Sequence, residues 1–204
     1  MKNINFYKLT AAGNDFVLID NRNNIIRESE QSALALKLCD RKYAIGADGL
    51  ILLEKSEKAD FRMRYYNSDG SHASMCGNGG RSIARFAYEL GIVKQNMKFE
   101  TDAGLITADI KSETVVNLAL YDPKDLQLDI KLQIEDKNFE ISSLNTGVPH
   151  AVIFVDDIEK INVFKYGRLI RHHEKFAPAG TNVNFVQVAE DNTILVRTYE
   201  RGVE

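Results

Sequence analysis

Three short motifs in the first part of the chain recur, in the same order, in the second part. Two of them are a glycine followed within a few residues by an apolar run, and the third is an Arg-x-Tyr-type segment. The matched positions are Gly13 and Gly147, Gly46 and Gly180, and Asn67 and Glu200, which lie 134, 134 and 133 residues apart. A near-constant spacing over three matches predicts a scaffold that is duplicated within one chain.

Apolar periodicity divides the two copies into strands and helices. Strands are predicted at 3–8, 16–20, 50–54, 61–66, 97–101, 104–110, 114–120, 130–135, 138–142, 151–155, 183–188 and 194–199. Helices are predicted at Glu30–Cys39, from after Gly80 up to Gly91, and around 162–172. The mixture predicts an α+β protein of two pseudo-symmetric α/β units. We place them at 1–120 and 121–204, with Asp122-Pro123 in the crossing.

Composition excludes several classes of function. A chain of 204 residues with 44% hydrophobic and 27% charged residues is typical of a globular domain with a sizeable core. The net charge of -3 argues against a broad nucleic-acid-binding face. No apolar run approaches a membrane span, and the first residues lack a signal-peptide pattern. We therefore expect a cytoplasmic protein with neither nucleic acid nor membrane as partner.

The cysteine and histidine pattern predicts no metal site. Cys39 and Cys76 are too few for a disulfide scaffold, and a reducing compartment disfavours their pairing. The adjacent pair His172-His173 has no acidic or cysteine partner at metal-ligand spacing, and neighbouring histidines point in different directions on a helix.

The segment around Cys76 carries the strongest chemical signal in the sequence. Cys76 is followed by the glycine-rich turn Gly77-Asn78-Gly79-Gly80 and then by an amphipathic helix. The free N–H groups of a helix N-terminus stabilise a thiolate and lower the pKa of a cysteine, and glycines let the backbone approach an anionic ligand. A buried apolar cysteine is the alternative, which we retain for Cys39. Neither a phosphate loop nor a dinucleotide fingerprint fits this glycine spacing, whereas a cysteine protease remains conceivable.

Six motifs, in order, resemble those of diaminopimelate epimerase: YNSDGS, MCGNGGR, FETDAG, NTGVPH, GTNVNF and YERGVE. The likeness runs from residue 1 to residue 204, and CGNGGR is its most specific part. It implies a duplicated epimerase fold in which each unit is a curved sheet around a central helix, the second unit being incomplete. Proline racemase-like enzymes resemble the chain less in the GNGGR segment, and phenazine-pathway isomerases share the implied fold but lack the cysteine.

The resemblance implies interconversion of LL- and meso-diaminopimelate without pyridoxal phosphate or any other cofactor, for lysine and peptidoglycan synthesis. In the family one cysteine thiolate removes the α-proton while a second thiol delivers a proton from the opposite face. The implied catalytic residues are Cys76 as one acid/base, with His150 and Glu200 tuning the cysteines. The implied substrate-binding residues are Asn14, Asn67, Gly77, Asn78, Asn182, Glu200 and Arg201.

The chain departs from the family pattern at three places. Val148 stands where many relatives have asparagine, and Gly49 where some have glutamine, which removes expected polar contacts. The repeat also predicts a partner of Cys76 near position 209, beyond Glu204. We therefore expect these 204 residues alone not to complete epimerisation. Alternatives are a racemase for another amino acid and a non-catalytic amino-acid-binding fragment, whose uncovered apolar face would favour a homodimer.

Overall fold

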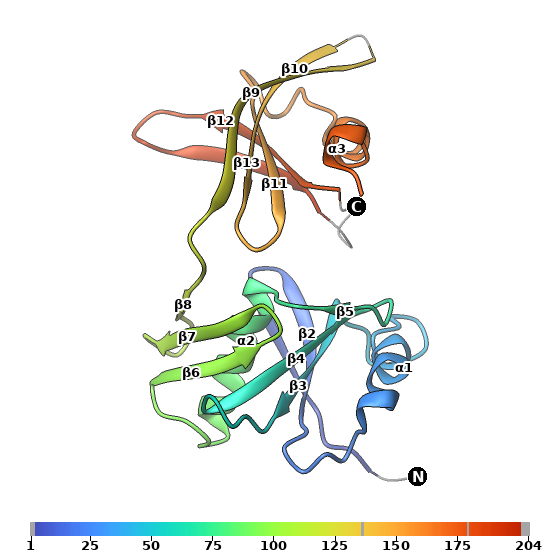
Figure 1. The fold of residues 1–204 in the computed structure, drawn as a ribbon, viewed down its shortest axis with the longest axis vertical. Coiled ribbons are helices and arrows are strands. Elements are labelled where there is room, and N and C mark those ends of the chain that lie inside the picture. The colour runs from blue at the N-terminus through green and yellow to red at the C-terminus, as the bar shows by residue number, and fades with distance from the viewer. Residues whose placement is uncertain (1–2, 136, 179, 201–204) are drawn as a thin grey trace. The chain divides into compact units, whose positions relative to one another are not determined.

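The computed structural model describes residues 3–135, 137–178 and 180–200, and the chain divides into two compact units, Met1–Leu120 and Tyr121–Glu204. Each unit combines a β-sheet with helices, so the predicted α+β class is confirmed (Figure 1).

The first unit contains an eight-stranded sheet with the order β1-β2-β3-β4-β6-β7-β8, in which the short β5 pairs with β4. Its strands are β1 (Tyr7–Ala11), β2 (Asn14–Asp20), β3 (Gly49–Glu54), β4 (Phe61–Asn67), β5 (His72–Ala73), β6 (Asn96–Thr101), β7 (Gly104–Ile110) and β8 (Val116–Ala119). Its helices are α1 (Glu28–Leu38) and α2 (Gly77–Glu89).

The two helices of the first unit pack on opposite faces of the sheet. Along β3, Leu50 and Leu52 join the apolar cluster that contains Ala35 and Cys39 of the α1 segment. Because side chains alternate along a strand, Ile51 points to the other face, and its Cδ1 lies against Gly79 of α2. Burial on both faces explains why β3 reads as a continuous apolar run rather than an alternating one.

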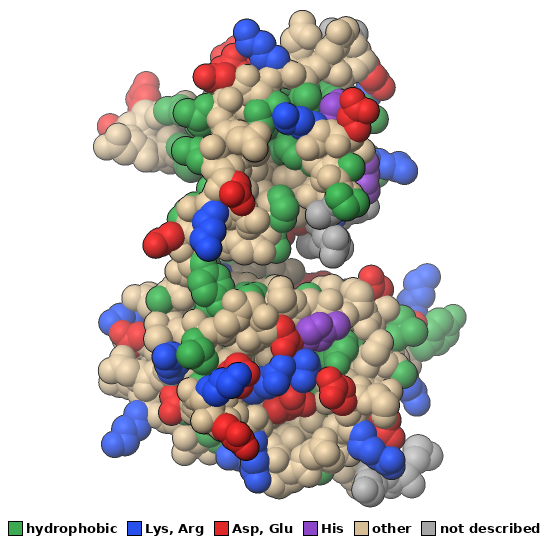
Figure 2. Space-filling view, viewed as in Figure 1, with side chains coloured by type: hydrophobic (Ala, Val, Ile, Leu, Met, Phe, Trp, Pro, Cys, Tyr) green, Lys and Arg blue, Asp and Glu red, His purple; other side chains and the backbone are tan. Residues whose placement is uncertain are grey.

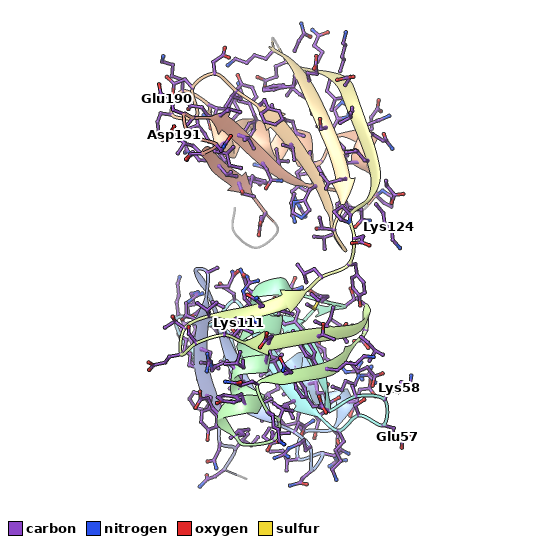
Figure 3. All side chains as sticks on the ribbon, turned by 90° about the vertical axis from the view of Figure 1, so that its left-hand side faces the viewer. Glu57, Lys58, Lys111, Lys124, Glu190 and Asp191 are labelled. Atoms are coloured by element: carbon purple, nitrogen blue, oxygen red, sulfur yellow. The ribbon has the colours of Figure 1, made fainter. Side chains whose placement is uncertain are left out.

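The second unit contains a five-stranded sheet with the order β13-β12-β11-β10-β9. Its strands are β9 (Lys124–Ile134), β10 (Lys137–Asn145), β11 (Pro149–Phe154), β12 (Asn182–Val188) and β13 (Ile194–Tyr199), and its helices are α3 (Val163–Arg171) and the 3₁₀ turn η1 (Glu174–Phe176). Figure 3 shows Glu190 and Asp191 at the turn between β12 and β13, and Lys124 where the chain enters β9. The core lies between α3 and one face of the sheet.

The duplication predicted from the sequence is present in the fold. The path β1-β2-α1-β3-β4 of the first unit recurs as β10-β11-α3-β12-β13 in the second, and in both the successive strand pairs are antiparallel, parallel and antiparallel. The four glycines of the repeat have positive φ angles, namely Gly13 (89°), Gly46 (74°), Gly147 (108°) and Gly180 (70°). Positive φ is the conformation that glycine adopts most readily, which explains the recurrence of this residue type.

The two copies differ in register by one residue. Phe16 pairs with Gly49 between β2 and β3, whereas His150 pairs with Asn182 between β11 and β12. The paired residues are 33 positions apart in the first unit and 32 in the second. The structural counterpart of Gly49 is therefore Asn182, and not Val183, which lies 134 positions further along the chain. The repeat therefore fixes the topology of the second unit but not the placement of each side chain.

Opposite charges are intermixed on the visible face of the first unit (Figure 2). The pairs include Arg62 with Asp102, Arg64 with Glu54, and Lys58 with Glu100. Within residues 3–200, leaving aside 136 and 179, no helix is long and apolar enough to cross a membrane. The same described residues bring no three His, Cys, Asp or Glu side chains together as metal ligands.

Candidate active site

Cys76 is the N-cap residue of α2. Its backbone is extended (φ -143°, ψ 123°), and its Sγ accepts a hydrogen bond from the backbone N–H of Gly79 at 3.4 Å. The side chain is half-buried rather than enclosed in the core. The thiol therefore lies beside the free N–H groups of the first turn, where the helix dipole favours a negative charge.

The glycines after Cys76 lie within α2, which begins at Gly77 and not after Gly80 as the sequence predicted. A Cβ atom at Gly79 would lie 3.1 Å from Ile51 and from Met63, and one at Gly80 would lie 3.0 Å from Leu118. Glycine is a poor helix former, but here it lets the first turn approach the sheet closely. Tertiary packing thus outweighs helix propensity at the end of α2 that carries the thiol.

Asn14 and Asn78 are joined side chain to side chain across the first unit. The amide of Asn78 donates to Oδ1 of Asn14 at 2.6 Å, and Asn14 donates to Oδ2 of Asp48 at 3.1 Å. Arg81 donates to the side-chain oxygen Oδ1 of Asn78. Two predicted substrate contacts from distant parts of the chain, β2 and α2, are therefore brought together next to Cys76.

A cluster of charged side chains lies next to the Asn14–Asn78 pair. Asp15 accepts from Arg41 at 2.6 Å and lies 3.0 Å from Lys8, and Arg41 also reaches Asp48 at 2.7 Å. The Arg41 hydrogen bond, aided by Lys8, holds the pKa of Asp15 well below its ordinary value although burial opposes the shift. Asp15 therefore stays charged at neutral pH, and the Arg41 guanidinium holds Asp15 and Asp48 together beside Asn14.

Asn67 is the last residue of β4, and both the oxygen and the nitrogen of its side-chain amide form hydrogen bonds. Its Oδ1 accepts from the hydroxyl of Tyr65 at 2.9 Å, and its nitrogen donates to the hydroxyl of Ser71 at 2.9 Å. These bonds fix the orientation of the amide, which is what a residue that contacts substrate requires.

The predicted residues of the second unit lie together on its sheet. His150 and Asn182 are direct partners on β11 and β12, and Glu200 follows the end of β13. Burial lowers the pKa of His150, and the charge of Glu200 acts in the opposite direction. Asn184, which the sequence did not single out, lies 3.2 Å from Nδ1 of His150. Arg201 lies outside the described residues.

Val148 and Gly49, the two positions whose residue types depart from the family pattern, lie in different local environments. Val148 is 44% exposed in the turn before β11, where its carbonyl accepts from Thr146 N–H at 3.1 Å. At Gly49 a Cβ atom would lie 2.5 Å from Cε2 of Tyr65, so the tyrosine ring occupies the space of any side chain there. Each departure is therefore compatible with the local packing of this chain.

A diaminopimelate epimerase family model matches residues 6–121 and 142–204. The chain belongs to the diaminopimelate epimerase family. The resemblance seen in the six sequence motifs is thereby confirmed, and the Cys76 segment lies inside the first matched range.

Curated members of the family match most of the chain. The diaminopimelate epimerase of Hydrogenobaculum sp. (strain Y04AAS1) is 46% identical over 207 residues, which cover 97% of this chain and 75% of that protein. That of Aquifex aeolicus (strain VF5) is also 46% identical, over 208 residues that cover 98% of this chain and 74% of that protein.

Solved structures of lower identity share the fold. A Bacillus anthracis phenazine biosynthesis protein of the PhzF family has a TM-score of 0.72 at 18% identity, covering 98% of this chain and 72% of its own. A probable proline racemase from Agrobacterium radiobacter K84, with bound carbonate, has a TM-score of 0.68 at 15% identity, covering 96% and 70%.

Proposed function

We propose that the chain binds diaminopimelate and that Cys76 moves the proton on its α-carbon, as a diaminopimelate epimerase. The observation that carries the proposal is the place of Cys76. In a chain of this family, it is the half-buried N-cap of a helix whose first turn consists of glycines and an asparagine. A thiol with this environment is suited to acid-base chemistry on a bound anion.

The first turn of α2 would bind the α-carboxylate. The backbone N–H groups of Gly77 and Asn78 point out of the helix end, and the dipole favours a carboxylate there. Asn14 and Asn67 would contact the amino or distal groups of the substrate through the amide positions that their hydrogen bonds leave open.

In the proposed step the Cys76 thiolate removes the α-proton. The S–H bond forms, the C–H bond breaks, and its electron pair remains on the α-carbon, where the adjacent carboxylate delocalises it. The amides at the helix end stabilise the negative charge that develops. The reverse transfer returns a proton from the sulfur to the same face of the carbon. No pyridoxal phosphate takes part, as the family resemblance implies.

Inversion at the α-carbon needs an acid on the opposite face of the substrate. Cys39 does not fit this role, because it is buried among apolar residues and burial raises its pKa to about 11. A polypeptide of these 204 residues is therefore proposed to exchange the α-proton at one face without converting one isomer to the other.

The residues of the second unit complete the proposal. Asn182, Glu200 and Arg201 are proposed substrate contacts, and His150 with Glu200 is proposed to adjust cysteine acidity. The complete reaction would interconvert LL- and meso-diaminopimelate and so supply the meso isomer for lysine and peptidoglycan synthesis.

Protection of Cys76 from alkylation tests the substrate class. The protein is treated with iodoacetamide with increasing meso-diaminopimelate, or with proline, and labelling of each cysteine is measured by mass spectrometry. We expect diaminopimelate to slow labelling of Cys76 while proline has no effect. Protection by proline alone would favour a racemase for that amino acid, and no protection by either would contradict the proposal.

A further inference from the structure

The ring of Tyr65 lies over the backbone of Gly49. Tyr65 pairs with Ile51 across β3 and β4, and Gly49 pairs with Asn67 two residues further along. A Cβ atom at Gly49 would lie 2.5 Å from Cε2 of Tyr65, 2.6 Å from the backbone carbonyl oxygen of Tyr66 and 3.1 Å from the hydroxyl of Tyr65. The absence of a side chain at position 49 is therefore what admits the tyrosine ring to this place.

From this place the hydroxyl of Tyr65 reaches Asn67. It donates to Oδ1 at 2.9 Å, while the Asn67 nitrogen donates to Ser71 at 2.9 Å. A primary amide has two N–H donors and two acceptor lone pairs. The two bonds use one donor and one lone pair, and they fix which way the remaining donor and lone pair point.

The environment keeps Tyr65 as a hydrogen-bond donor. The residue is 8% exposed, and its ring meets Phe16 edge-on with the centroids 6.0 Å apart. Burial raises the pKa of Tyr65, and a negative charge on nearby Cys76 raises it further. The hydroxyl therefore retains its proton at neutral pH and remains a donor to Asn67.

Resting on the proposed function, we propose that Tyr65 is a positioning residue for substrate binding. Its hydroxyl holds Asn67 in the orientation in which the amide contacts diaminopimelate, and Gly49 is required because a larger side chain would collide with the ring and with the Tyr66 carbonyl oxygen. Tyr65 itself touches neither the substrate nor the reacting carbon.

The Tyr65→Phe variant isolates the hydroxyl, because the ring and its packing over Gly49 are retained. The affinity for meso-diaminopimelate is measured from its protection of Cys76 against iodoacetamide, and the melting temperature from circular dichroism. One hydrogen bond acting through Asn67 predicts that Tyr65→Phe weakens binding about 3- to 10-fold. Asn67→Ala should weaken it at least as much, and adding Tyr65→Phe to Asn67→Ala should have no further effect.

The Tyr65→Leu variant provides a second measurement. Because the Tyr66 carbonyl oxygen would lie 2.6 Å from a Cβ atom at position 49, Gly49 is kept in every variant. Tyr65→Leu removes the ring as well as the hydroxyl, so it should weaken binding at least as much as Tyr65→Phe and lower the melting temperature further. A role in stability alone would lower the melting temperatures of both variants without weakening the binding of diaminopimelate.

The outcomes separate the two proposals. Two results would overturn the role of Tyr65 but leave the proposed function intact. One is an equal affinity of the original protein and Tyr65→Phe for diaminopimelate. The other is that Tyr65→Phe weakens binding by the same factor in the Asn67→Ala background as in the original protein. Failure of diaminopimelate to protect Cys76 in the unsubstituted protein would overturn the proposed function and the role of Tyr65 with it.

Discussion

Cys39 and Cys76 illustrate how the surroundings of one side-chain type decide its chemistry. Cys39 is 3% exposed in an apolar cluster, and burial raises its pKa to about 11. Cys76 is half-buried at the N-terminus of α2, where Gly79 donates to its sulfur. Only the second has both solvent access and groups that favour a thiolate, so alkylation of the folded protein reports on Cys76.

The titration of His150 is a prediction at the scale of one residue. Burial lowers its pKa, while Glu200 opposes the shift. We expect NMR titration to give a value below 6.5, and Glu200→Gln to lower it further because the opposing charge is lost.

The lowered pKa of His150 also has a consequence for stability. The unfolded chain binds the proton more readily than the folded one, so His150 makes folding less favourable as the pH falls below about 6.5. A titration value at or above 6.5, or one unchanged by Glu200→Gln, would contradict the burial of His150 and the nearness of Glu200.

Sequence motifs could identify Cys76, Gly77 and Asn78 as candidate site residues because these are consecutive in the chain. They could not identify Tyr65 or Asn184, since the contacts of both depend on which strands pair and in what register. Two apolar strands leave that register open until the turns and helices that join them are known.

At the scale of elements, the four repeat glycines predict a graded effect of alanine. Gly46 and Gly180 have positive φ, and a Cβ atom would lie 2.9 Å from the Arg41 backbone and 3.0 Å from the Arg171 carbonyl. Gly13 and Gly147 also have positive φ but nothing within 4 Å.

Alanine should therefore cost about 1–2 kcal/mol of unfolding free energy at Gly13 or Gly147, from backbone strain alone. The loss at Gly46 or Gly180 should be larger by about 1–3 kcal/mol because the neighbouring backbone must also move. Urea unfolding measures all four variants. Equal losses for the Gly13 and Gly46 variants, and for the Gly147 and Gly180 variants, would show that the close approach of the neighbouring backbone is not significant.

Element ends were the least predictable features, for identifiable reasons. The first strand was predicted at 3–8 but is Tyr7–Ala11, because the turn at Ala12 and Gly13, both with positive φ, sets its pairing with β2. β9 begins at Lys124, earlier than the predicted 130, because pairing with β10 extends it although Leu126 and Leu128 remain exposed. Such ends are decided by the partner strand rather than by local composition.

At the scale of the whole molecule, each unit contains a hydrophobic cluster of its own among the described residues. The clusters around Leu50 in the first unit and around Phe185 in the second draw only on residues of their own unit. We therefore expect urea unfolding to show two transitions, with Gly46→Ala moving one midpoint and Gly180→Ala moving the other. A single transition, or one midpoint displaced by both substitutions, would contradict independent cores.

The duplicated architecture was predictable from the sequence because it depends on glycine positions and apolar runs, which recur at a nearly fixed interval. The one-residue difference in register between the units was not, since it arises from how β12 pairs with β11. Topology therefore follows from the pattern, whereas the exact side chains that reach a substrate require the structure.

Proton exchange in heavy water tests the central claim most directly, namely that the Cys76 thiolate removes the α-proton of diaminopimelate. The protein is incubated with each stereoisomer in D₂O, and deuterium at the α-carbon is followed by mass spectrometry, with Cys39→Ala as the matched control for Cys76→Ala. The account predicts deuterium incorporation that Cys39→Ala retains and Cys76→Ala lowers at least 100-fold, about the smallest contribution of a general acid-base group. Incorporation that persists in Cys76→Ala would contradict it.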